Sequence, residues 1–85
     1  MSKIEWNKRA YKQLKKLPLK VRTAVIHAVE QLPEPDGWRN VKSLTNHRYD
    51  YRLRVGGYRV LFDLEDEEIK VYFIQEVKKR DERTY

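Results

Sequence analysis

The chain has no cysteine, two histidines, three glycines and three prolines among its 85 residues. Without cysteine it has no disulfide framework, no thiolate zinc site and no cysteine nucleophile. The absence of disulfides predicts a reducing compartment, so we expect a cytoplasmic protein. Apolar runs reach four residues at most, which excludes a membrane-spanning helix and a signal-peptide core.

The scarcity of histidine also limits the chemistry. His27 falls in a predicted helix, where we expect a structural role, and His47 falls in a predicted loop. We therefore expect no metal site and no cofactor. No serine has the context of a nucleophile elbow, and no glycine-rich loop is suited to hold a nucleotide phosphate. Acyl transfer and nucleotide hydrolysis are thus excluded.

Charged side chains are abundant. Lys and Arg number 19 against 13 Asp and Glu, a net charge of +6. A hydrophobic content of 40%, with 12% aromatic residues, is sufficient for a small core, and we expect one domain over residues 1–85. The basic excess makes polyanions attractive partners.

The first part of the chain predicts a strand and two helices. Residues 1–6 alternate in polarity, and Asn7 is a suitable N-cap for a helix that ends before Pro18. A second helix is predicted from the 3.6-residue spacing of apolar side chains between Val21 and Leu32. The first helix presents an apolar face made of Ala10, Tyr11, Leu14 and Leu17.

From Tyr49 onward the hydrophobic period changes to two, which predicts strands over residues 49–55, 58–65 and 69–77. The element order is β-α-α-β-β-β, an α+β fold with two helices packed on one face of an antiparallel sheet. A further short strand near residues 42–44 is only weakly indicated. We place the tyrosines Tyr49, Tyr51 and Tyr58 in the core.

The turns fix the expected pairing of these strands. Gly56-Gly57 as a two-residue turn pairs Val55 with Tyr58 and places Arg54 opposite Arg59. The second hairpin is expected to turn at Asp66-Glu67, which would put Asp63 opposite Lys70.

This register gathers cations on one face of the sheet: Arg52, Arg54 and Arg59, with Lys78 and Arg80 if the last strand continues. Like charges opposite each other are normally destabilising. One explanation is an anion-binding surface; the other is that the arginines extend into solvent and pair with Asp50 or Glu76. RNA cleavage suits the first, because RNA supplies its own 2′-OH nucleophile and arginines stabilise the developing charge.

The run from Tyr51 to Phe62 (YRLRVGGYRVLF), the acidic hairpin after it, the segment Val77–Arg80 (VKKR) and the terminal Tyr85 together resemble the RelE family of toxins. The resemblance covers nearly the whole chain. It implies a ribosome-dependent mRNA interferase of a type II toxin–antitoxin pair. The implied partners are a RelB-like antitoxin, mRNA and the A site of the small ribosomal subunit.

The resemblance also implies roles for individual residues. Arg59 and Arg80 would stabilise the scissile phosphate, Arg52 would bind phosphate, and Tyr85 would stack on the substrate and help activate the 2′-OH. Asp50 stands where the family has a lysine, so it is either a general base or a salt-bridge partner of Arg52, the role that we favour. The other cations expected to bind RNA are Arg54, Lys78, Lys79, Lys42, Arg48, Lys12, Lys15 and Lys16.

Several alternatives stay open. The general base is one of Asp50, Tyr85 and His47, because arginine keeps its proton too firmly to serve. The lysines of the helices, with Lys8, Arg9 and Arg22, either follow ribosomal RNA phosphates or form a solvated surface. Trp38 is expected in the core or at an antitoxin contact. The competing functions are a ParE-like inhibitor of DNA gyrase and a nucleic-acid-binding module without catalysis.

Overall fold

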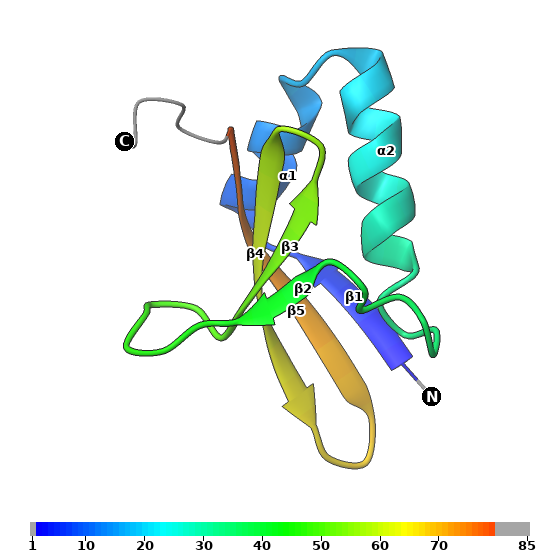
Figure 1. Cartoon of the computed structure of the whole chain (residues 1–85), viewed down its shortest axis with the longest axis vertical. Helices are drawn as coiled ribbons and strands as arrows, with labels where there is room; N and C mark the ends of the chain where they lie inside the picture. The colour runs from blue at the N-terminus through cyan, green and yellow to red at the C-terminus, as the bar shows by residue number, and fades with distance from the viewer. Residues whose placement is uncertain (1, 80–85) are drawn as a thin grey trace.

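The structure is a computed structural model that describes residues 2–79. Within these residues, two helices and five strands follow one another (Figure 1). Their bounds are β1 (Ser2–Trp6), α1 (Lys8–Lys15), α2 (Leu19–Glu30), β2 (Val41–Ser43), β3 (Tyr51–Val55), β4 (Tyr58–Asp66) and β5 (Lys70–Lys79). Within the described residues, neither helix is long and apolar enough to cross a membrane.

The helices form within about two residues of the predicted positions, since α1 ends at Lys15 before Pro18 and α2 ends at Glu30, two residues short of Leu32. The Asn7 side chain accepts a hydrogen bond from the Ala10 N–H (2.7 Å) and caps α1, and Pro18 occupies the N-cap position of α2. Ala10 and Leu14 of α1 are buried. Tyr11 is not, because 52% of it is exposed; its predicted place on the apolar face is wrong.

The sheet has the strand order β1-β5-β4-β3-β2. All neighbours pair antiparallel except β1, which runs parallel to β5. The sheet is therefore mixed, which corrects the fully antiparallel sheet expected from the sequence. The two helices carry the chain from β1 back to the sheet, and a connection of this kind allows parallel pairing with a distant strand. The weakly indicated short strand exists as β2.

The first hairpin has the predicted register. Val55 pairs with Tyr58, Arg54 with Arg59, and Tyr51 with Phe62. Gly56 adopts a φ of +56°, a conformation that glycine reaches without steric cost.

The second hairpin differs from the prediction. Asp66 pairs with Lys70 across a three-residue connection, so Asp63 lies opposite Phe73 and not opposite Lys70. An odd-numbered connection exchanges the two faces of the following strand. For this reason Tyr72 and Ile74, which the expected Asp66-Glu67 turn would have placed on the outward face, are buried.

A β-bulge in β5 then restores the predicted faces. Phe62 pairs with Ile74 but its neighbour Leu61 pairs with Glu76, so Gln75 is the extra residue of β5. Beyond this bulge Val77 is buried and Lys78 lies opposite Arg59. The placement of Lys78 is therefore as predicted, although it results from a three-residue connection and a bulge and not from the predicted two-residue turn.

The core lies between the helices and one face of the sheet. Among its fully buried side chains are Val25, Val29, Val60, Phe62 and Ile74. Trp38 packs edge-on against Tyr51, with ring centroids 4.9 Å apart, which agrees with the predicted core position. Tyr51 also belongs here, whereas Tyr49 is buried outside this cluster and Tyr58 is only half-buried.

Candidate functional site

The face of the sheet opposite the core carries two rows of side chains that cross neighbouring strands. The first row places Arg54 opposite Arg59 and Arg59 opposite Lys78. The second row runs from Lys42 to Arg52, then to Leu61 and Glu76. We refer to Lys42, Arg52, Arg54, Arg59 and Lys78 as the cationic face.

Three of these cations line one small pocket. Arg52, Arg54, Arg59 and Tyr58 surround a volume of about 70 Å³ at the end of the β3–β4 hairpin. Arg52 and Arg59 are half-buried and Arg54 is exposed. Sequence reasoning missed Tyr58, which it assigned to the core. The signal available was its position directly after the turn and next to Arg59.

Among the described residues, no carboxylate forms an ion pair with the pocket arginines. Among residues 2–79 the ion pairs within 4.0 Å are Lys3–Glu5, Arg9–Glu76 and Lys70–Asp66. Glu76 shares the face with Arg52 but pairs with Arg9 of α1. Guanidinium groups held together without anionic partners form a surface that an anion stabilises.

Asp50 lies apart from this pocket. Its backbone N–H donates to the Asp63 carboxylate (2.7 Å), and its side chain borders a separate depression with Arg48, Glu65 and Gln75. Asp63 is four residues from Arg59 along β4, about 13 Å of extended strand. The expected Asp50–Arg52 salt bridge is absent among the described residues.

No family model and no curated protein sequence matches this chain. Among solved structures it is similar to the isolated RelE toxin of E. coli, at 27% identity and a TM-score of 0.72, over 95% of this chain and 86% of that one. A chain of the RelBE2 toxin–antitoxin complex of Mycobacterium tuberculosis shares 25% identity with a TM-score of 0.75, over 92% and 96%.

A further match decides the family. A chain of the intact E. coli RelBE toxin–antitoxin complex is 31% identical, with a TM-score of 0.66, over 92% of this chain and 95% of that one. The chain belongs to the RelE family of toxins.

Two of the site residues implied by the RelE resemblance are Arg80 and Tyr85, and both lie outside the described residues. Lys78 and Lys79 are the last two described residues of β5, and both are exposed. Lys78 belongs to the cationic face, whereas Lys79 lies opposite Tyr58. Arg48 lies in the loop before β3 and borders the depression of Asp50.

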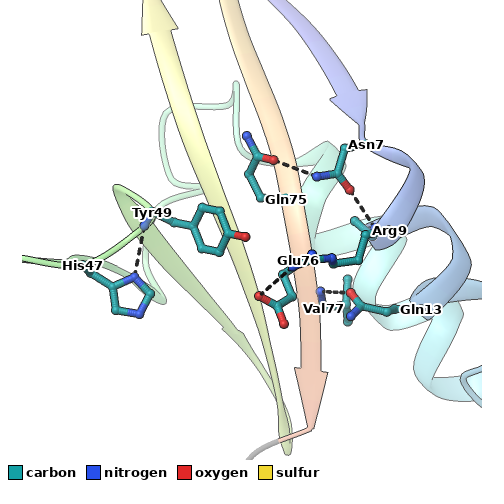
Figure 2. Close-up of polar contacts among 9 residues, drawn as sticks. Asn7, Arg9, Gln13, His47, Tyr49, Gln75, Glu76 and Val77 are labelled. Atoms are coloured by element: carbon teal, nitrogen blue, oxygen red, sulfur yellow. Dashed lines mark hydrogen bonds and ion pairs between the residues drawn. The ribbon is translucent and has the colours of Figure 1, made fainter.

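The two histidines of this RelE-family chain lie in different surroundings. His47 accepts a hydrogen bond on Nδ1 from the Tyr49 N–H (3.1 Å), which leaves Nε2 for other partners (Figure 2). His27 lies in α2 and is exposed. Within residues 2–79, no three potential metal ligands come together.

The basic residues of the helices divide into two groups. Arg22 donates from Nη2 to the carbonyls of Lys15 and Leu17 (3.4 and 3.2 Å), and Arg9 pairs with Glu76. These two arginines therefore form intramolecular contacts. The remaining cations of α1 and its C-cap are exposed: Lys8, Lys12, Lys15 and Lys16.

Proposed function

We propose that this protein is the toxin of a type II toxin–antitoxin pair and acts as an endoribonuclease on mRNA in the ribosomal decoding site. Its membership of the RelE family supports the toxin role. The observation that carries the nuclease role is the pocket in which Arg52, Arg54 and Arg59 meet without carboxylate partners among the described residues.

The pocket suits phosphoryl transfer to a ribose hydroxyl. The 2′ oxygen of RNA attacks the adjacent phosphorus, the bond to the 5′ oxygen breaks, and a cyclic phosphate remains. Negative charge grows on the phosphate oxygens as the new bond forms. Guanidinium groups that are already in place stabilise this charge without having to reorganise. Arg59, next to Arg54 and Lys78, is the residue we assign to this role, together with Arg80.

Proton transfer needs a further group. The 2′-OH loses a proton to a general base and the 5′ oxygen gains one. Asp50 lies outside the pocket that Arg59 lines, so its place favours a structural role over that of the base. His47 and Tyr85 are the other candidates.

If Asp50 is structural, Asp50→Asn will change the cleavage rate and ribosome affinity by similar small factors. A selective loss of cleavage rate would instead make Asp50 the base.

The partners follow from the same proposal. The similar proteins of known structure include toxin–antitoxin complexes, and we propose a RelB-like antitoxin that covers the cationic face. The exposed lysines at positions 8, 12, 15 and 16 are proposed to contact ribosomal RNA phosphates. A polyanion of this kind would bind through many weak, salt-dependent contacts.

The deciding experiment is translation of a defined mRNA with the purified protein, followed by mapping of the new 5′ ends. We expect cleavage at fixed positions within codons. Arg59→Ala should reduce its rate by about 10²- to 10³-fold, the cost of losing one preorganised charge donor. The Arg59→Ala/Arg80→Ala variant should lose cleavage entirely. Arg39→Ala is the matched control, since Arg39 is exposed and outside the arginine pocket.

A parallel supercoiling assay tests the competing function. Inhibition of DNA gyrase with intact mRNA would overturn the nuclease proposal in favour of a ParE-like inhibitor. Ribosome binding without either activity would indicate a non-catalytic nucleic-acid-binding protein.

A further inference from the structure

The bulge at Gln75 determines which side chains of β5 join the cationic face. If β5 continued without it from the Phe62–Ile74 pair, Arg59 would lie opposite Val77, and Glu76 would face the core. A shift of one residue exchanges the two faces of a strand. The bulge therefore keeps Val77 buried and places Lys78 beside Arg59.

A chain of hydrogen bonds crosses the sheet at this bulge. The Asp63 carboxylate accepts from the Asp50 N–H (2.7 Å) and from the Gln75 side-chain amide (3.1 Å). The Gln75 oxygen accepts from the Asn7 side-chain amide (2.7 Å). The Asn7 oxygen in turn accepts from the Ala10 N–H (2.7 Å). This chain links the start of β3, the middle of β4, the bulge and the N-terminus of α1.

Helix α1 holds the next two residues of β5 as well. Figure 2 shows Arg9 reaching Glu76 and Gln13 reaching the backbone of Val77. The Gln13 oxygen accepts from the Val77 N–H at 2.7 Å. Strand β1 pairs with β5 only as far as Ile74. Beyond Ile74, side chains of α1 contact β5 in place of β1.

We propose that Asp63, Gln75 and Asn7 are positioning residues that hold the β5 bulge and thereby keep Lys78 in the cationic face opposite Arg59. A bulge leaves one residue out of the backbone pairing, and burial of Val77 in place of Glu76 favours the bulged register in spite of this cost. The side-chain contacts of Gln75 add to this preference by holding the extra residue in place. The effect on cleavage rests on the proposed function, whereas the effect on register does not.

The polarity of the hydrogen bonds gives a sharp test. In Asp63→Asn, the side-chain oxygen still accepts from Asp50, but its amide then faces the Gln75 amide, donor against donor. In Gln75→Glu, two carboxylates face each other. The double variant Asp63→Asn/Gln75→Glu reverses the polarity, because Asn now donates to Glu and Glu still accepts from Asn7. It also keeps the net charge of the natural protein.

The first readout is the register of the free protein by NMR. We expect each single variant to weaken the cross-strand NOE between Arg59 and Lys78 and to speed hydrogen exchange of the Val77 amide by about tenfold, the size of typical coupling between contacting groups. The double variant should recover both. Asp66→Asn is the control, since Asp66 is an exposed carboxylate at the end of the same strand, and it should change neither.

The second readout is mRNA cleavage on the ribosome. The single variants should lower kcat by about tenfold with little change in KM, and the double variant should restore kcat. Unchanged register in both single variants, or no recovery in the double variant, would overturn the proposal. If the unmodified protein does not cleave mRNA, the proposed function fails, while the NMR measurements still decide whether the Asp63–Gln75 contact fixes the bulge.

Discussion

The two hairpins of the sheet share strand β4 but differ in how their register is set. In the β3–β4 hairpin, the tight turn at Gly56-Gly57 fixes every pair from Val55–Tyr58 to Tyr51–Phe62. In the β4–β5 hairpin, a three-residue connection joins the strands, and the pairing shifts by one residue at the Gln75 bulge. A short turn with glycine fixes the strand register locally. A longer acidic connection is compatible with more than one register, so packing of the core and of α1 determines which one forms.

The largest expected loss of stability comes from a change that affects both hairpins. Phe62 is fully buried and pairs with Tyr51 on one side and Ile74 on the other. Phe62→Ala should lower the free energy of unfolding by about 3–5 kcal/mol, through lost burial and the cavity that remains. Urea denaturation followed by circular dichroism measures this. A loss below about 1 kcal/mol would mean that the two hairpins do not share a core.

The next effect distinguishes the two glycines of the tight turn. Gly56 has a φ of +56°, and a side chain there costs about 1–2 kcal/mol. Gly57 does not have a positive φ, and a Cβ at this position meets no atom within 4 Å. Thermal unfolding should therefore show clear destabilisation for Gly56→Ala and little change for Gly57→Ala. Equal losses in the two variants would contradict the turn geometry.

A smaller effect tests the charge repulsion within the first hairpin. Arg54 lies directly opposite Arg59, so Arg54→Gln should stabilise the free protein by about 0.2–1 kcal/mol while weakening RNA binding. The gain should shrink as salt is raised from 0.05 to about 1 M, because exposed charges are screened. Arg39→Gln is the matched control. A loss of stability at low salt would show that Arg54 forms favourable contacts in the free protein.

The smallest effect is expected in the connection of the second hairpin. Ile69 is 47% exposed and lies between the paired residues Asp66 and Lys70. Ile69→Ser should change the free energy of unfolding by less than about 0.5 kcal/mol and leave the register intact, because the register is decided elsewhere. A shift in the Arg59–Lys78 NOE would show that the connection itself sets the pairing.

The predictions from sequence were most accurate where interactions between near neighbours in the chain decide the structure. Asn7, Pro18 and the glycine turn fix their elements through groups close by in the chain, and Arg52, Arg54 and Arg59 follow from that turn alone. The predictions were wrong about the second turn, because the acidic segment has no residue that demands one turn type. They could not identify the parallel pairing of β1 with β5, since strands far apart in sequence give no local signal of their partner.

The sequence by itself determined the two helices, the first hairpin and the placement of three arginines on one face, because each depends on contacts between near neighbours. The sequence also placed Lys78 on this face, but through a two-residue turn that does not form, and only the tertiary structure decided the bulged register that puts Lys78 there. That placement depends on Asn7, Asp63 and Gln75, which lie up to 68 residues apart and meet only when α1 docks beside β5. The hydrophobic period of one helix or strand does not predict contacts between residues this far apart in the sequence. Their contact arises from the packing of α1 against β5.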